Sequence, residues 1–137
     1  MNRDQALGEV KKRVKNNNLR KHMYAVEAVM RQLARRLEGD EEKWALAGLL
    51  HDIDYEETAQ QPDRHSLAGA EILKALGLDE EIAYAVKVHN PAHGLERRSL
   101  MDSALHIADR LTGLIVAAAL IHPEKKLADI DPQFILN

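Results

Sequence analysis

Histidine and aspartate, two of the residue types that bind metal ions in proteins, stand side by side at His51 and Asp52. The pair follows the apolar run of residues 45–50 and falls where a predicted helix ends. A neutral imidazole and a carboxylate in that place can bind one cation, which the negative end of the helix dipole also favours. Adjacent His-Asp pairs are common in proteins without a metal, so this motif indicates a metal site only in combination with others.

Two other residues raise the same question. Asp109 stands in the middle of a predicted, mostly buried helix. A buried carboxylate needs a partner, which is either a cationic side chain such as Arg110 or a metal ion. His22 lies one turn before Val26 on the apolar side of another predicted helix. Taken alone, His22 is better explained as a core histidine that is hydrogen-bonded to a backbone carbonyl.

In sequence order, the four residues form the pattern His22…His51-Asp52…Asp109. This order resembles the H…HD…D signature of the HD superfamily of metal-dependent phosphohydrolases. The resemblance covers about residues 18–121 and includes the local sequences GLLHDI at 48–53 and ADRL at 108–111. It implies a helical bundle in which the four side chains bind one ion, with Asp52 at the centre of a catalytic site that hydrolyses phosphoesters.

Two further histidines, His65 and His89, lie at the edges of predicted helices. They resemble the additional histidine ligands found in binuclear members of the superfamily. This resemblance implies a second metal ion bound by His65 and His89, with Asp52 bridging the two ions. The alternative is a single ion, with both histidines contacting the substrate phosphate beside it. The chain has no cysteine, so nitrogen and oxygen atoms must supply every ligand. Such a set suits Mn, Fe, Co, Ni, Zn or Mg.

The chain departs from better-known branches of the superfamily. It lacks the GYP triplet and paired histidines of the HD-GYP type, which argues against cyclic dinucleotides as substrates. Tyr55 stands where the HDIGK variant has lysine, so one phosphate contact is missing. Asp54, Glu56 and Glu57 predict an acidic mouth to the site, where Glu56 or Asp54 could act as general acid or base. The alternative is a solvated acidic loop.

A phosphate substrate needs positive groups near the ion. Arg64 precedes His65 and Arg110 follows Asp109, so we expect these two arginines to contact phosphate, with Arg110 also taking part in catalysis. Arginine matches the geometry of carboxylates as well, so Arg110 could instead be a structural ion-pair partner.

Apolar residues recur at three- and four-residue spacing along nearly the whole chain, which predicts an all-α, HD-domain-like bundle of about six helices without a sheet. Asp40, Asp79 and Ser99 are expected to cap helices at their N-termini, and Gly39 and Gly77 are expected to end them. The predicted helices comprise a short one ending before residue 16 and those at about 19–37, 40–52, 63–76, 79–89 and 99–121.

The 137 residues fit a single domain spanning 1–137. Asp131-Pro132 predicts the start of one more helix, since proline suits the first helical position. The apolar residues 134–136 follow it directly. They dock on the core, pack against another chain, or mark a chain that lacks the C-terminal helices of a longer parent protein.

Charge and hydropathy exclude several classes of protein. The net charge is −3, and the basic cluster at residues 11–15 is expected to be the solvated face of a helix, so we expect no nucleic-acid partner. The longest apolar run, residues 114–121, is far shorter than the roughly 20 residues of a membrane span, and residues 2–4 do not open a secretory signal. We expect a cytoplasmic protein without a membrane partner, and we leave homo-oligomer formation open.

Three functions remain after these exclusions. The first is hydrolysis of a small phosphorylated molecule, with a nucleotide the best single guess, by attack of a metal-activated water. The second is a di-iron oxygenase-type enzyme, because some relatives with extra histidines hold two irons and oxidise their substrate. The third is a non-catalytic module that uses the helical bundle to bind a ligand or assemble with a partner.

Overall fold

Helices make up most of the part of the chain that the structure, a computed structural model, describes, namely residues 1–121 and residue 133. In chain order these are α1 (Arg3–Arg13), α2 (Asn17–Leu37), α3 (Glu41–Leu50), the 3₁₀ helix η1 (Pro62–Arg64), α4 (Leu67–Ala75), α5 (Glu80–Val88), the 3₁₀ helix η2 (Pro91–His93) and α6 (Leu100–Ile121). Within the described residues there is no strand, so the predicted all-α bundle of about six helices is confirmed. The expected helix at 131–132 and the apolar residues 134–136 lie outside the described residues.

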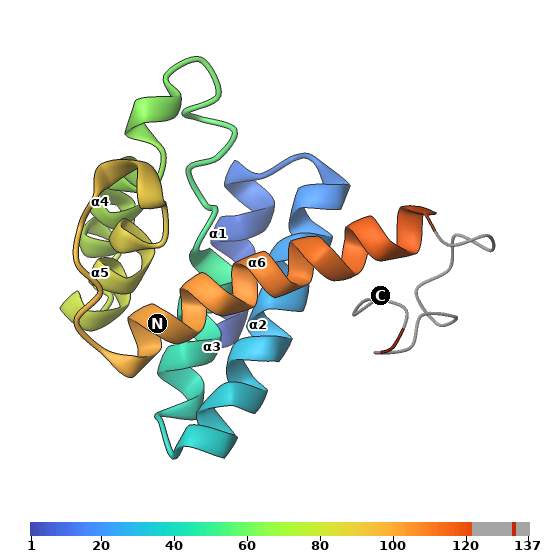
Figure 1. Ribbon diagram of the computed structural model, residues 1–137. Coiled ribbons are helices and arrows are strands. Elements are labelled where there is room, and N and C mark those ends of the chain that lie inside the picture. The colour runs from blue at the N-terminus through green and yellow to red at the C-terminus, as the bar shows by residue number, and fades with distance from the viewer. Residues whose placement is uncertain (122–132, 134–137) are drawn as a thin grey trace.

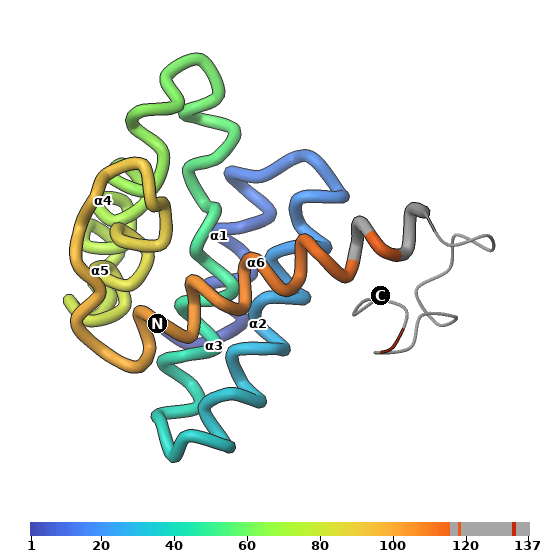
Figure 2. Tube along the Cα trace, viewed as in Figure 1, coloured from blue at the N-terminus to red at the C-terminus, as the bar shows by residue number. Residues whose placement is uncertain are grey.

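Helix α3 occupies the centre of the bundle. It packs against α1, α2, α5 and α6, and α6 runs across both α2 and α3 (Figure 1). Helices α4 and α5 pack as a pair beside this group, and the tube in Figure 2 follows the chain to them from the end of α3 through the loop of residues 51–66. Among the described residues, none of the helices is both long enough and apolar enough to cross a membrane. Because α3 is central, the residues that follow its last turn lie deep in the bundle.

Helices α2 and α3 approach most closely at Gly48. A Cβ atom there would lie 2.9 Å from the carbonyl oxygen of Val26 and 3.0 Å from the Cα of Glu27, so any side chain would force the helices apart. Val26 lies one turn after His22, and Gly48 lies about one turn before His51. The close helix packing therefore brings these two histidines together.

Side-chain caps fix where two of the helices begin. The carboxylate of Asp40 accepts a hydrogen bond from the backbone N–H of Lys43 at 3.1 Å, and the hydroxyl of Ser99 accepts one from the N–H of Asp102 at 3.1 Å. Both caps were predicted. Asp79 also precedes its helix, but it makes no capping bond, because its carboxylate pairs with Lys43 at 3.0 Å instead.

The end of α2 differs from the prediction at Gly39. The left-handed residue that ends the helix is Glu38, with φ of 58°, and not the glycine that follows it. Gly39 is needed for a different reason, because a Cβ atom there would lie 2.5 Å from the ring of Trp44. The packing of Trp44 against the backbone, rather than helix termination, therefore explains why residue 39 is a glycine.

The fourth helix starts later than expected. Residues 63–66 were predicted to be helical, whereas η1 ends at Arg64 and Ser66 takes a positive φ of 74° before α4 begins. Such a conformation costs a non-glycine residue about 1–3 kcal/mol and persists only where neighbouring contacts enforce it. Three contacts do so here: the Ser66 N–H donates to Asp54 at 2.7 Å, its hydroxyl donates to the Lys87 carbonyl at 2.8 Å, and the Gly69 N–H donates to Asp54 at 2.8 Å.

Candidate metal centre

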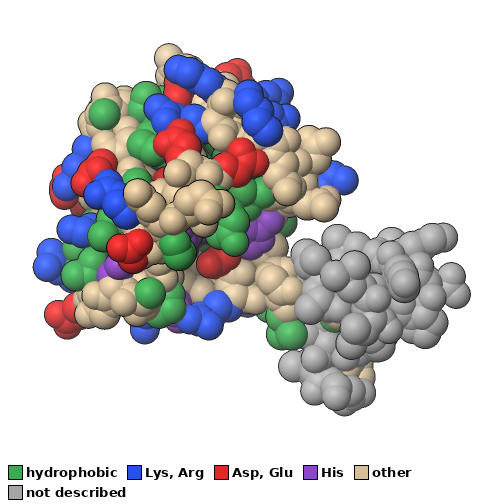
Figure 3. All heavy atoms as spheres, turned by 90° about the horizontal axis from the view of Figure 1, so that it is seen from above, with side chains coloured by type: hydrophobic (Ala, Val, Ile, Leu, Met, Phe, Trp, Pro, Cys, Tyr) green, Lys and Arg blue, Asp and Glu red, His purple; other side chains and the backbone are tan. Residues whose placement is uncertain are grey.

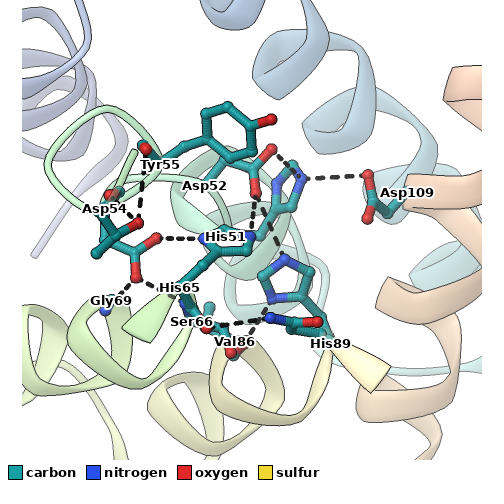
Figure 4. Close-up of polar contacts among 12 residues, drawn as sticks. His51, Asp52, Asp54, Tyr55, His65, Ser66, Gly69, Val86, His89 and Asp109 are labelled. Carbon is teal, nitrogen blue, oxygen red and sulfur yellow. Dashed lines mark hydrogen bonds and ion pairs between the residues drawn. The ribbon is translucent and has the colours of Figure 1, made fainter. Parts of the chain in front are cut away.

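Four ligand atoms, from α2, from α6 and from the two residues that follow α3, meet at one point of the bundle. The Nε2 atom of His22 lies 2.9 Å from Oδ1 of Asp109 and 3.2 Å from Nε2 of His51. His51 Nε2 in turn lies 3.2 Å from Oδ2 of Asp52 and 3.5 Å from Oδ1 of Asp109 (Figure 4). An ion with bonds of about 2.0–2.2 Å to nitrogen and oxygen holds neighbouring ligand atoms about 3 Å apart. The distances between His22, His51 and the two carboxylates run from 2.9 to 3.6 Å, close to that spacing.

A second group of ligand atoms lies on the other side of Asp52. The Oδ1 atom of Asp52 is 3.3 Å from Nε2 of His65 and 3.4 Å from Nε2 of His89. Thus one carboxylate oxygen faces the His22 group and the other faces the His65 group, and the two groups share Asp52. This arrangement is what a carboxylate bridging two ions requires.

The backbone brings these side chains together from distant parts of the chain. His51 and His89 are the C-terminal cap residues of α3 and α5, so both rings project from the last turn of a helix. His22 comes from α2, Asp109 from α6, and His65 from the turn before α4. Histidine side chains also reach the surface on the face seen from above, with acidic and basic groups nearby (Figure 3). The side chains of His22, Asp109 and His65 are 22%, 31% and 17% exposed, so the cluster is partly open to solvent.

In the rings of His51 and His89, a hydrogen bond to a backbone carbonyl determines that Nδ1 is the nitrogen that carries the proton. The Nδ1 atom of His51 donates to the Gly48 carbonyl at 2.7 Å, and Nδ1 of His89 donates to the Val86 carbonyl at 2.5 Å. A carbonyl can only accept, so in a neutral ring each Nε2 atom carries a lone pair that points at Asp52. Metal-binding histidines are typically held in this way, by a bond from the nitrogen that does not bind the ion.

His65 is held by a carboxylate instead of a carbonyl. Its Nδ1 atom donates to Oδ1 of Asp54 at 2.8 Å, while Oδ2 of Asp54 accepts from the N–H groups of Ser66 and Gly69. A Cβ atom at Gly69 would lie 3.3 Å from this carboxylate, so the absence of a side chain allows the close approach. Asp54 therefore positions His65 and the start of α4 together.

The electrostatics of the cluster call for a positive charge at its centre. Burial alone would lower the pKa of His51, but the charges and hydrogen bonds of Asp52 and Asp109 outweigh it and raise that pKa to about 10. Burial would raise the pKa of Asp52, yet the charge on His51 and hydrogen bonds from the histidines hold it well below its usual value. Lone pairs and carboxylates that converge in this way repel one another unless protons or a metal ion lie between them. The donor set of imidazole nitrogens and carboxylate oxygens fits a divalent cation.

The same pKa shifts predict how the stability of metal-free protein depends on pH. Burial lowers the pKa of His65, but hydrogen bonds to Asp52 and Asp54 raise it to about 9, beside the value of about 10 for His51. A histidine whose pKa is higher in the folded state stabilises the fold fully below its unfolded value of about 6.5, and loses that stabilisation as pH rises through the folded value. In the presence of a chelator, the melting temperature should therefore fall between pH 6.5 and pH 9.5.

Thermal melts at these two pH values, with chelator and with Ni²⁺, measure this effect. Metal replaces the protons, so the rise in melting temperature caused by Ni²⁺ should be larger at pH 9.5 than at pH 6.5. Identical melts of the chelated protein at both pH values, or a smaller effect of metal at the higher pH, would contradict the prediction.

The loop after Asp52 does not form the acidic mouth that was expected. Asp54 is fully buried beneath α4. The carboxylate of Glu56 accepts hydrogen bonds from the backbone N–H groups of Lys15 and Asn16 at 2.8 and 2.7 Å, and Glu57 pairs with Arg13 at 2.8 Å. Glu56 therefore binds the backbone between α1 and α2, and no described hydrogen bond or ion pair joins its carboxylate to the clustered histidines.

The two arginines expected to contact phosphate have different surroundings. The guanidinium of Arg64 pairs with the carboxylate of Glu71 at 3.2 Å. The Nε atom of Arg110 donates to Nε2 of His106 at 3.0 Å. Burial and the nearby charges of Arg97 and Arg110 lower the pKa of His106, which favours the neutral ring that accepts this bond. Neither arginine makes a described hydrogen bond or ion pair with the six clustered residues.

Two residues that sequence reasoning gave no role hold the backbone of His65 in place. The side-chain amide of Asn90 donates to the His65 carbonyl at 3.2 Å, and Nε2 of His93 donates to the same oxygen at 2.7 Å. Both come from the turn after α5, more than twenty residues away in sequence, so no local spacing pattern connects them to His65. They tie the second group of ligand atoms to the end of α5.

A protein-family model matches most of the chain. The family model described as HD domain matches residues 19–114, a range that contains all six clustered histidine and aspartate residues.

Several curated proteins are similar to part of the chain. Ribonuclease Y of Lawsonia intracellularis is 31% identical over 83 residues, which cover 61% of this chain and 16% of that protein. Ribonuclease Y of Oleidesulfovibrio alaskensis is 29% identical over 108 residues, 78% of this chain and 20% of that protein. An uncharacterized protein of Methanocaldococcus jannaschii is 35% identical over 88 residues, 64% of this chain and 50% of that protein. The matched regions thus span at most half the length of these relatives.

One solved structure has the same fold along nearly the whole chain. The crystal structure of a predicted HD superfamily hydrolase from an uncultured Thermotogales bacterium matches with a TM-score of 0.71 and 24% identity, covering 98% of this chain and 81% of that one. At this identity the likeness shows the shared fold.

Proposed function

Because the chain belongs to the HD domain family, we propose that it is a metal-dependent hydrolase that cleaves a phosphoester of a small molecule. One observation above all supports this proposal. The two oxygens of Asp52 face two separate groups of imidazole nitrogens, at 3.2 Å from His51 on one side and 3.3 Å from His65 on the other. A buried carboxylate between two sets of lone pairs suits the binding of cations better than any purely structural role.

We assign the ligands as two sets that share Asp52. The first ion would be bound by His22, His51, Asp52 and Asp109, and the second by Asp52, His65 and His89. The ions, drawn from Mn, Fe, Co, Ni, Zn or Mg, would lower the pKa of a bound water and offset the negative charge of a phosphoryl group. Asp54, the Gly48 carbonyl and the Val86 carbonyl would keep the ligating nitrogens free of protons.

Arg110 is the cation that we propose for contact with the substrate phosphate. It is exposed, it follows Asp109 directly, and its described hydrogen bond goes to a neutral ring, so its charge is not offset by a carboxylate there. Arg64 is a poorer candidate, because Glu71 already pairs with its charge.

Replacing Arg110 with alanine should therefore raise KM for a phosphoester about tenfold, whereas Arg64→Ala should leave KM within about twofold of the wild-type value. Steady-state kinetics of the two variants at one metal concentration make the comparison. Equal effects of the two substitutions would argue against a particular role for Arg110.

Removal and return of metal test the function as a whole. Protein stripped with a chelator should lose hydrolysis of a panel of phosphomonoesters, nucleotides and a short RNA, and should regain it with Mn²⁺, Co²⁺, Ni²⁺, Mg²⁺ or Fe²⁺. The RNA belongs in the panel because two relatives are named ribonuclease Y. Two irons per chain with oxygen consumption would indicate the oxygenase alternative instead. If no metal restores turnover of any substrate in the panel, the remaining hypothesis is that the protein is a non-catalytic binding module.

A further inference from the structure

A cleft of about 420 Å³ opens beside His65, next to the second group of ligand atoms. One wall comes from the loop of residues 51–66, which rises at the top of Figure 1, and contributes Tyr55, Thr58, Ala59 and Pro62. The other wall comes from the turn after α5 and includes Asn90. The volume is within the range of small-molecule sites, about 300–1,000 Å³. A ligand in this cleft would contact the same imidazole ring that faces Asp52.

The lining of the cleft offers little to a charged or hydroxyl-rich group. Its residues include no lysine, arginine, aspartate or glutamate. The amide of Asn90 is already used, since its oxygen accepts from the Ala92 N–H at 3.1 Å and its nitrogen donates to the His65 carbonyl at 3.2 Å. The Thr58 hydroxyl donates to the Asp54 carbonyl at 2.8 Å. Burying a phosphate or a bare sugar here would remove its hydration without replacing it.

Tyr55 gives the cleft an aromatic surface. Its ring meets the His65 ring edge-on, with 5.3 Å between centroids and 84° between planes, and the residue is 53% exposed. A T-shaped contact covers at most one face of a ring, so at least one face of the Tyr55 ring is available for stacking. Because stacking tolerates many flat heterocycles, such a surface favours a planar base over an aliphatic group.

We propose that this cleft binds the heterocyclic base of a nucleotide substrate, with Tyr55 stacking on the base while the phosphate lies at the metal ligands. The inference rests on the proposed hydrolase function and narrows its substrate class. The lining of the cleft carries no charge, its polar side chains are already hydrogen-bonded within the protein, and the Tyr55 ring is exposed at one wall. These three features suit a heterocyclic base. The shared His65 places the base beside the reacting phosphate.

Equilibrium dialysis with labelled adenosine and labelled ribose tests the proposal on the full, metal-loaded chain. Neither probe carries a phosphate, so the result does not depend on turnover. Adenosine should bind about tenfold more tightly than ribose, Tyr55→Ala should remove that preference, and Tyr55→Phe should keep it. Tyr84→Ala, which alters a tyrosine of a different cleft, is the matched control and should leave the preference unchanged.

A second variant tests the cleft with the tyrosine intact. Ala59 is exposed, so tryptophan at that position should fill the cleft without disturbing the core. Ala59→Trp should weaken adenosine binding at least about tenfold. Equal binding of adenosine and ribose by the wild-type protein, or a preference that survives both Tyr55→Ala and Ala59→Trp, would overturn the proposal. Failure of hydrolysis with the adenosine preference intact would refute the hydrolase function alone.

Discussion

Replacing Asp52 with asparagine should lower phosphoester turnover roughly a thousandfold or more, with loss of at least one bound ion. Each oxygen of Asp52 faces a different histidine, His51 at 3.2 Å and His65 at 3.3 Å. Asparagine has only one side-chain oxygen, so its NH₂ group would take the place of the other. That group would face the Nε2 atom of either His51 or His65, where it cannot bind a cation. The measurement is kcat together with metal content per chain by elemental analysis.

Asp63→Asn is the control for this experiment, because it makes the same chemical change on an exposed residue of the neighbouring 3₁₀ helix. It should leave both turnover and metal content unchanged. An Asp52→Asn protein that folds and retains both ions and most of its turnover would contradict the assignment of Asp52 as a shared ligand.

The second large effect is expected at Asp54, which is not one of the proposed ligands but accepts a hydrogen bond from His65. In an Asp54→Asn variant the amide oxygen can still accept from Ser66 and Gly69, but the amide nitrogen would then face Nδ1 of His65, and two donors would oppose each other. His65 would respond by moving its proton to Nε2, the atom that lies 3.3 Å from Asp52. Such changes to a residue behind a ligand typically cost about 10- to 100-fold in metal affinity. The loss should fall on the second ion only.

Titration calorimetry with Mn²⁺ can separate the two ions, and Asp102→Asn provides the matched control. Asp102 is a buried carboxylate that likewise accepts two backbone N–H groups, from Arg98 and Ser99 at the start of α6, but no described hydrogen bond joins it to a histidine. Both variants should lose some stability, because each weakens a helix start. A change in metal affinity that is the same in both would show that general destabilisation, and not the His65 proton, is responsible.

Much of the fold follows from local rules that a single sequence displays. Asp40 and Ser99 cap helices as predicted, because a capping bond spans three residues and depends on little else. Where a long-range contact competes, the local rule fails. Asp79 pairs with Lys43 from another helix, and Trp44 rather than helix termination explains Gly39.

The candidate site shows the same division. Four of its residues were inferred from their order along the chain, and the structure brings one ligand atom of each within 4.8 Å of the others. The groups that orient them were not foreseen, since Asp54, Asn90 and His93 meet His65 only through tertiary packing. The partners of Glu56 were not foreseen either, because its place in an acidic run gave no indication that the backbone of Lys15 and Asn16 would bind it.

Diffraction from crystals grown with Mn²⁺, recorded near the manganese absorption edge, tests most directly whether His22, His51, Asp52 and Asp109 bind a common cation. An anomalous peak about 2.0–2.3 Å from a nitrogen or oxygen of each of these side chains is the expected result. Manganese bound elsewhere, with the four side chains joined to one another only by hydrogen bonds, would contradict it.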